Sequence, residues 1–331
     1  MKRLLVALLV AGCSAEEPAV QAPSDPVVVY ASYEDKTYLP GLLSRFTEET
    51  GIVVIARHGG REQIVDDLIA DEINPPADVI VTRSARGITR AADDGWLRPL
   101  PAGTVPESVP QSLVDGDGFW VALAFRVPLI VYDTRVADLP VPKSFDDLAA
   151  EAYLGRLCLA AAENLANRTV IASLINERGV RATELLVRGW VANLATTDID
   201  DEEGLLRAIE EGRCAIGIAG SQTFLQAAAG DGDGVIGTIA LADAGIDVEA
   251  IGIGRHARNP DGAARLIAWM LEDDFQGEHS AATLQSPASE AVSDRPASIV
   301  SFDRGVIVPG SKNVAWADEE ALRLAERARF P

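Results

Sequence analysis

Short apolar runs alternate with longer amphipathic segments near the start of the chain, and this alternation constrains the fold more than any other feature. The runs at 27–30, 52–55 and 79–81 are rich in valine and isoleucine, as buried strands are. The segments between them are long enough to hold helices. A β-α-β-α-β order predicts a parallel sheet, because parallel neighbours need a long crossover rather than a tight turn.

The first intervening segment has the spacing of an amphipathic helix. Gly51 follows it as a terminator, and a second helix carrying Ile64 and Leu68 is expected before Pro75 and Pro76. Ligands of parallel sheets bind at the carboxyl ends of the strands. The apolar face of the first helix recurs at i, i+3, i+4 and i+7 and consists of Leu39, Leu42, Leu43 and Phe46.

A second α/β unit follows, and 331 residues are more natural for two lobes than for one core. The long apolar run at 121–133 could carry the chain between them. We therefore expect an α/β fold with two lobes, each a mainly parallel sheet flanked by helices, and a ligand cleft between. We place lobe 1 at 27–128 plus 247–331 and lobe 2 at 129–246. Further strands are expected at 157–160, 215–219 and near 250, with helices near 167–178, 181–194, 201–212, 264–270 and 318–328.

The charge and the motifs exclude two classes of function. A net charge of −21 argues against nucleic acid as a partner. The sequence contains no nucleophile elbow, phosphate-binding glycine loop, HExxH or CxxC motif. We therefore expect a binding protein rather than an enzyme.

The N-terminus predicts export. Lys2 and Arg3 precede a short apolar core, too short to span a bilayer, and together they form a signal peptide at 1–12. The sequence Val10-Ala11-Gly12-Cys13 resembles the bacterial lipobox, which implies lipidation of Cys13. The acidic, proline-rich stretch at 13–26 has the composition of a tether. We expect a periplasmic or cell-surface lipoprotein held at a membrane.

Two cysteines remain after Cys13. Cys158 and Cys214 lie in or beside apolar segments. Export places them in an oxidising compartment, where an even pair predicts one disulfide. Two buried free thiols are the alternative.

The order of segments resembles the ferric-iron-binding subgroup of type II periplasmic binding proteins, the solute-binding components of ABC importers. This resemblance implies two lobes that close over a small solute, permease subunits in the membrane as partners, a monomer, and iron(III) or another metal as the transported ligand rather than a resident cofactor. The matching stretches are 29-VYASYEDKTYLPGLLSRFTEETGI, 75-PPADVIVTRSARGITRAADDGWL, 117-DGFWVALAFRVPLIVYDT, 145-FDDLAAEAYLGRLCLA, 170-VIASLI, 205-LLRAIEEGRCAIGIAGS and 252-GIGRHARNPDGAARLIAWML.

The chain departs from this family where the metal would bind. The family usually supplies a Tyr-Tyr pair after the strand predicted at 215–219, but here the chain reads 220-GSQTF. Ala166 stands where another family tyrosine is expected, and Glu34 and Asp35 replace a histidine and a tyrosine. Of the five tyrosines, only Tyr33 is placed at the cleft. The usual phenolate site is therefore missing.

One hypothesis is a hard metal held by carboxylates. Glu34, Asp35, His58 and Glu163 are its candidate ligands, because oxygen-rich clusters bind hard cations. Glu34 and Asp35 could instead cap the helix that follows them, and His58 could be an ordinary loop residue.

A second hypothesis is a small anion or an anionic chelate. Arginines at 57, 61, 83, 86, 126 and 168 fall at predicted strand ends or at cleft positions of the family, and guanidinium groups suit carboxylates and phosphates. A third hypothesis is a lipoprotein that binds a partner and has lost transport. The predicted ligand-binding residues are Ser32, Tyr33, Arg83, Ser84, Arg126, Asn164, Ser221, Gln222 and Thr223.

Overall fold

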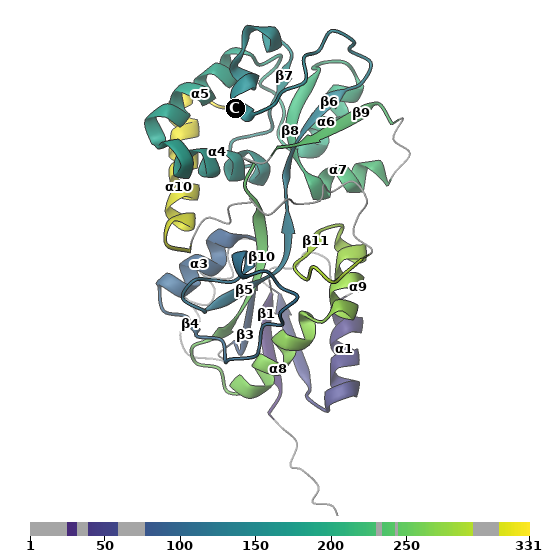
Figure 1. Cartoon of the computed structure of the whole chain (residues 1–331), viewed down its shortest axis with the longest axis vertical. Helices are drawn as coiled ribbons and strands as arrows, with labels where there is room; N and C mark the ends of the chain where they lie inside the picture. Colours follow the sequence, from purple (N-terminus) through teal and green to yellow (C-terminus); the bar gives the residue numbers. More distant parts are fainter. Residues whose placement is uncertain (1–24, 32–38, 59–76, 230–233, 242–243, 294–310) are drawn as a thin grey trace, which may run out of the picture.

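The protein folds into two lobes, each built on its own sheet (Figure 1). The computed structural model describes residues 25–31, 39–58, 77–229, 234–241, 244–293 and 311–331. Lobe 1 contains the larger sheet, in the order β11-β5-β10-β3-β1-β2 with β4 beside β10. Its strands are β1 (Val27–Ala31), β2 (Val54–His58), β3 (Val79–Thr82), β4 (Leu97–Arg98), β5 (Trp120–Arg126), β10 (Asp247–Gly254) and β11 (Ser286–Pro287).

Lobe 2 contains the smaller sheet, in the order β7-β8-β6-β9. Its strands are β6 (Pro128–Asp133), β7 (Leu157–Cys158), β8 (Ile216–Gly220) and β9 (Ile236–Ala240). The helices are α1 (Leu39–Thr50), α3 (Ala85–Asp93), α8 (Pro260–Met270) and α9 (Asp273–Thr283) in lobe 1, then α4 (Leu165–Arg178), α5 (Val180–Ala192), α6 (Glu202–Glu210), α7 (Ser221–Ala228) and the C-terminal α10 (Ser311–Ala328).

The first helix and the parallel strands follow the sequence pattern. The face of α1 formed by Leu39, Leu42, Leu43 and Phe46 is buried, and Gly51 ends the helix with a positive φ of 73°. β1 pairs in parallel with both β2 and β3. β2 lies slightly later than the predicted 52–55, because pairing with β1 starts at Val54.

Neither sheet is mainly parallel, which differs from the expectation. In the larger sheet, β10 is antiparallel to β3, β4 and β5, and β11 is antiparallel to β5. The smaller sheet differs in the same way. Only β7 and β8 are parallel, whereas β6 is antiparallel to both β8 and β9. The cause is the route of the chain: β6 starts at the cleft with Pro128, and β8 ends there with Gly220, its partner in the register.

The chain crosses between the lobes within the apolar run that the sequence singled out. Val127 alone separates β5 of the larger sheet from β6 of the smaller one. The return strand β10 begins at Asp247, which pairs with Arg126 at the end of β5. β10 then passes between β3 and β5 at the centre of the larger sheet. Two neighbouring strands therefore connect the lobes.

Lobe 2 is cross-linked internally. Cys158 in β7 and Cys214 just before β8 form a disulfide, the pair that the sequence suggested. Asn193 adds two hydrogen bonds of 2.8 Å to the carbonyl oxygens of Leu148 and Ala150. The disulfide ties segments 56 residues apart in the sequence.

The C-terminal helix contacts both lobes. α10 packs against α4 and α5 of lobe 2 and against α3 of lobe 1 (Figure 1). The sequence-based division assigned this helix to lobe 1, and that division stays a prediction. No helix in the described part of the chain is both long and apolar enough to span a bilayer.

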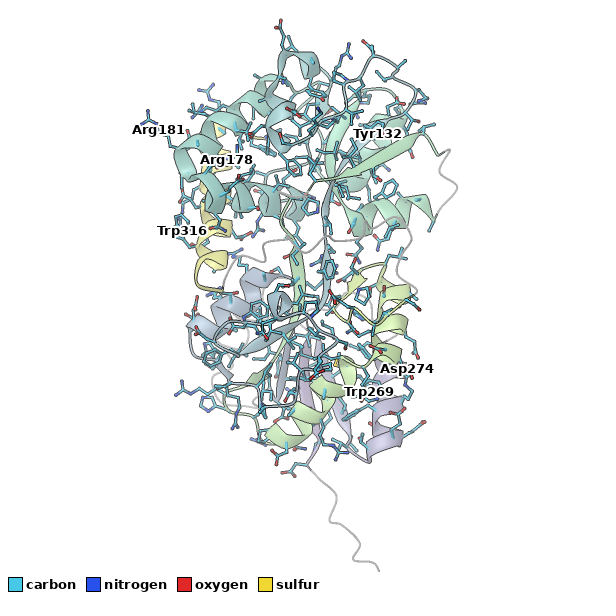
Figure 2. All side chains as sticks on the ribbon, in the orientation of Figure 1. Tyr132, Arg178, Arg181, Trp269, Asp274 and Trp316 are labelled. Atoms are coloured by element: carbon cyan, nitrogen blue, oxygen red, sulfur yellow. A yellow bond between two sulfur atoms is a disulfide. The ribbon has the colours of Figure 1, made fainter. Side chains whose placement is uncertain are left out.

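Aromatic side chains fill the core of lobe 1. Trp269 of α8 packs edge-on against Phe46 of α1 and Phe275 of α9, with ring centroids 5.5 and 5.1 Å apart (Figure 2). The buried face of α9 includes the polar side chains of Gln276, His279 and Ser280.

Candidate functional site

A cavity of about 800 Å³ lies between the lobes, and both lobes line it. We call it the interlobe cavity. Lobe 1 contributes the start of α3, the crossing strands and the end of α9, while lobe 2 contributes the starts of α4, α6 and α7. The polar residues that line it are Arg83, Ser84, Glu163, Asn164, Arg168, Thr169, Asp200, Asp201, Glu202, Glu203, Gln222, Thr223, Gln226, Arg126, Asp247, Glu249, Thr283 and Gln285.

Helices begin at this cavity, and most of their first amides are already capped. The side chain of Asn164 accepts hydrogen bonds from the amides of Ala166 and Asn167, at 3.0 and 3.3 Å. Asp201 accepts from the Gly204 amide at 2.7 Å. These caps satisfy the positive ends of α4 and α6 within the chain. At α4 and α6 a ligand therefore meets capped helix ends, whereas α7 begins without a side-chain cap.

Carboxylates of the chain also reach the ends of α3 and α7. Asp247 accepts from the amide of Ala85, the first residue of α3, at 3.3 Å. Glu202 accepts from the amide of Gly220, just before α7, at 2.9 Å. Negative groups are favourable at helix N-termini. The places where an anionic ligand could bind are thus partly occupied by the protein's own acids.

Arg126 is paired with a carboxylate at the strand crossing. Its guanidinium group donates to Asp247 and to the carbonyl oxygen of Arg83, and both members of the ion pair are buried. Burial raises the pKa of Asp247, although Arg126 opposes this effect. The need for a partner explains why a charged residue can end an apolar strand. That partner is Asp247, and it lies 121 residues away in the sequence.

Arg168 is paired in a similar way. Its Nε donates to Oδ1 of Asp318 at 3.0 Å, and its Nη2 donates to Oδ2 of the same carboxylate. Arg86 of α3 lies 3.5 Å from Asp318 Oδ2. One carboxylate on α10 therefore binds an arginine from each lobe. Arg126 and Arg168 are thus both ion-paired within the protein, and Nε of Arg126 is buried without a hydrogen-bond partner.

The interlobe cavity carries an excess of negative charge. Seven carboxylates and three guanidinium groups line it, and two of those guanidinium groups are bound to buried carboxylates. Glu163, Asp200, Asp201 and Glu203 are exposed at the cavity. A cleft lined mainly by one sign of charge concentrates counter-ions of the opposite sign. The lining therefore favours a cation.

The structure brings most of the described predicted residues to the cavity. Arg83, Ser84, Arg126, Asn164, Gln222, Thr223 and Glu163 line it. Ser221 is fully buried beneath the lining, where its hydroxyl accepts from the Val127 amide at 3.1 Å. Gln222 donates to the carbonyl oxygen of Thr283 at 2.7 Å, which is a contact between the lobes.

The remaining predicted site residues, or their side chains, fall outside the described part of the chain. Ser32, Tyr33, Glu34, Asp35 and Cys13 fall outside the described residues. His58 ends β2, and its side chain is likewise outside the description.

No described residue that lines the cavity is a tyrosine. Tyr30 accepts a hydrogen bond from Arg57 at 3.1 Å. Tyr153 donates to the carbonyl oxygen of Pro140 at 2.8 Å, and Tyr132 lies in β6 of lobe 2 (Figure 2). The described residues also contain no group of three or more His, Cys, Asp or Glu side chains arranged to hold a metal. A phenolate pair is thus absent from the described lining.

Sequence reasoning missed Asp247, Glu249 and Asp318. Asp247 and Glu249 belong to a strand that is buried throughout, so acidic residues in such an apolar run are a signal of partners or ligands. Asp318 lies in a helix whose sequence is rich in charged residues, as in a helix exposed to solvent. No local sequence pattern indicates that Arg168 is its partner.

A family model described as "Bacterial extracellular solute-binding protein" matches residues 74–303. Among curated proteins, the chain is similar to Iron uptake protein A1 of Synechocystis sp., with 24% identity over 283 residues, which cover 80% of this chain and 77% of that protein. The resemblance identified from the sequence motifs is therefore confirmed.

Solved structures show the same fold. A Bordetella ferric binding protein superposes with a TM-score of 0.82 at 22% identity, covering 92% of this chain and 99% of that one. A Trichodesmium protein (IdiA, FutA), solved in complex with iron and citrate ligands, gives a TM-score of 0.79 at 22% identity, covering 92% and 100%. Since the family model covers more than half of the sequence, this chain belongs to the bacterial extracellular solute-binding proteins.

Proposed function

We propose that this protein is the lipid-anchored solute-binding component of an ABC uptake transporter, and that its cargo is iron(III) or another metal, free or complexed. The observation that carries the cargo class is the excess of carboxylates in the interlobe cavity, together with the internal pairing of Arg126 and Arg168. The names of the relatives point the same way, since they include an iron uptake protein and a ferric binding protein.

Carboxylate oxygens would hold such a cargo. Hard, highly charged cations prefer oxygen ligands. Glu163 lies at the start of α4 and is exposed to the cavity. Glu34, Asp35, His58 and Tyr33 remain its proposed companions from lobe 1. Without a pair of phenolates, a metal that arrives with its own chelator needs fewer protein ligands than a bare ion.

Capture would proceed by closure of the lobes. The crossing at Val127 and the start of β10 are the points at which the chain can bend with little repacking. The hydrogen bond from Gln222 to Thr283 shows which surfaces meet. Cargo that binds the closed form more tightly shifts the population toward it. The closed form would then dock on the permease, with Cys13 holding the protein at the membrane.

A thermal titration tests the cargo class. The full chain, purified in detergent, is titrated with ferric citrate, manganese(II), citrate and phosphate while its melting temperature is followed. Binding raises the melting temperature by mass action. We expect a rise with ferric citrate or manganese(II), and a smaller rise in Glu163→Gln.

A small anion is the second candidate, because the starts of α3, α4, α6 and α7 converge on the cavity beside Arg83, and the start of α7 has no side-chain cap. It predicts a rise with phosphate or citrate alone that Arg83→Ala removes. That outcome would overturn the metal proposal. A full chain that responds to none of the four probes would favour the partner-binding lipoprotein.

The anchor has a separate test. Cys13→Ser should release the protein from the membrane fraction to the soluble fraction, and it should abolish labelling by a fatty-acid analogue. Unchanged membrane association in this variant would contradict the lipid anchor while leaving the cargo proposal intact.

A further inference from the structure

Glu249 lies at the floor of the interlobe cavity, on the strand that connects the lobes. It lines the cavity, yet its side chain is buried and the residue is only 1% exposed. The pairing of β10 with β5 shifts register between Glu249 and Ala250. Such an irregularity re-aims the side chains beside it. An acidic side chain in a strand that is buried throughout thus forms part of the cavity wall.

One oxygen of Glu249 has no partner. Oε2 accepts a hydrogen bond from Nε2 of Gln285 at 3.1 Å. Oε1 is buried and accepts no hydrogen bond in the described structure. A buried carboxylate oxygen left without a donor is costly. Glu249 therefore has an unmet requirement for a donor or a cation.

Gln285 presents a second unmet acceptor. It also lines the cavity, is 2% exposed, and has a buried Oε1 without a hydrogen-bond partner. Rotating the amide would place its oxygen against the carboxylate of Glu249, so the observed orientation is the favourable one. Two acceptor oxygens, one of them charged, consequently lie at one place in the cavity wall.

None of the described neighbours of Glu249 is a lysine or arginine that pairs with its carboxylate. The only basic group within ion-pairing distance among them is His279, whose Nε2 lies 3.5 Å from Oε1. This contact is not a hydrogen bond, because Oε1 of Glu249 is buried without a hydrogen-bond partner. Arg126, on the neighbouring strand, is paired with Asp247. A water molecule could donate hydrogen bonds to these oxygens, but it would not supply the missing positive charge.

We infer that Glu249 and Gln285 form a cation-binding subsite at the floor of the interlobe cavity, which receives the positively charged group of the cargo. A hydrated metal ion and an organic ammonium group share this chemistry. The inference rests on the proposed function only in placing the cargo in this cavity. It assigns a cargo contact to β10, two residues after Asp247, so that cargo binding acts close to the segment at which the chain passes between the lobes.

The decisive comparison is Glu249→Gln in the full chain, purified in detergent. The substitution keeps the size and the acceptor for Gln285, and it removes the charge. Dissociation constants are measured by calorimetry with ferric citrate, manganese(II) and putrescine. We expect at least about a tenfold loss of affinity for the probe that binds the wild type, the order of a charged hydrogen bond. The melting temperature without cargo should stay the same or rise, since an unbalanced buried charge has been removed.

Two matched variants control for charge and for folding. Asp115→Asn removes another buried carboxylate with one bonded and one unpartnered oxygen, but Asp115 does not line the cavity. The affinity of Asp115→Asn for the cation probe should equal that of the wild type. Glu202→Gln removes a cavity charge whose Oε2 is bound by Gly220, so it reports the general effect of one charge. Equal losses in Glu202→Gln and Glu249→Gln would overturn the subsite.

The probes separate this inference from the metal proposal. Metal binding that survives Glu249→Gln overturns the subsite and leaves the metal proposal standing. Putrescine binding that depends on Glu249 supports the subsite and overturns the metal as cargo. A wild type that binds none of the three cations overturns both. Gln285→Glu is a gain-of-function test. This variant should have a lower melting temperature than the wild type without cargo, and adding the cation that binds should restore that temperature. A site that holds only water would show no such restoration.

Discussion

Two of the described junctions between the lobes pair arginine with aspartate, but in different ways. At the strand junction, formed by Arg126, Val127 and Asp247, the ion pair lies between the neighbouring ends of β5 and β10, where the chain passes between the lobes. At the helix junction, formed by Arg86, Arg168 and Asp318, only side chains connect the lobes, through one carboxylate on α10.

This difference makes the strand junction a hinge and the helix junction a contact that favours one arrangement of the lobes, which we call the latch. Bending at the strand junction can preserve its ion pair, because Arg126 and Asp247 move together as register partners. Opening or closing the lobes must change the helix junction, because Arg86 and Arg168 belong to different lobes and share Asp318. The same chemistry thus supports stability at one junction and conformational preference at the other. Four measurements can break or sharpen this comparison.

The largest effect is expected from Asp247→Ala. It leaves Arg126 buried without its carboxylate, and breaking one partner of a buried pair costs about 3–5 kcal/mol. Equilibrium unfolding in urea measures the loss. The shape of the folded protein in small-angle X-ray scattering should stay unchanged. A loss below about 1 kcal/mol would show that the strand junction does not depend on the pair.

Removing the disulfide by replacing Cys158 and Cys214 with serine should cost about 2–4 kcal/mol, since the cross-link closes a long loop within lobe 2. Urea unfolding again measures it. Because this region lies within one lobe, cargo affinity and scattering profile should match the wild type. A change in either would mean that stability and lobe geometry cannot be separated in this protein.

A smaller loss of stability, about 2 kcal/mol, is expected from Asp318→Asn, because Arg86 is partly exposed and the asparagine still accepts one hydrogen bond. The distinguishing result is a change of shape. The radius of gyration without cargo should differ from that of the wild type, unlike in Asp247→Ala. An unchanged radius would remove the latch from the comparison.

The smallest effect concerns pH. Burial lowers the folded-state pKa of His279, behind β10, and the facing charged group is Glu249. Since the folded pKa lies below the unfolded value of 6.5, the unfolded state binds the extra proton first. Stability from this group is complete above pH 6.5 and is lost as pH falls, by at most about 1.4 kcal/mol per pH unit. His279→Gln should flatten that slope in urea unfolding between pH 5 and 7. An identical slope in both proteins would show that the pH dependence of stability arises from other groups.

Local patterns were enough to predict much of the fold. The spacing of Leu39, Leu42, Leu43 and Phe46 placed α1, and the valine-rich runs placed β1 and β3. The run at 121–133 marked the crossing, but not that Val127 divides it between two sheets. The buried face of α9 was not predicted, because Gln276 and His279 occupy buried positions at which an amphipathic pattern has apolar residues.

The site was less predictable, since its meaning depends on distant partners. Arg126 and Arg168 were identified as cleft residues, but the sequence did not indicate that Asp247 and Asp318 bind them from 121 and 150 residues away. Because those carboxylate partners could not be seen in the sequence, Arg126 and Arg168 looked suited to an anionic ligand. Glu249 was missed because it stands out only by a carboxylate oxygen that has no hydrogen-bond partner. No local sequence pattern indicates such an unsatisfied oxygen.

The position of β10 has a consequence for the order in which the protein is assembled. It lies between β3 and β5 at the centre of the larger sheet, yet it follows the whole of lobe 2 in the sequence. Lobe 2 can complete its sheet as soon as β9 is available, whereas lobe 1 must wait for a strand that is more than a hundred residues downstream of β5. Non-local pairing of this kind slows folding. In pulse-labelled hydrogen exchange we therefore expect the amides of β6 and β8 to become protected before those of β3 and β5, so the cargo cavity exists only once the slower lobe has closed around its last central strand.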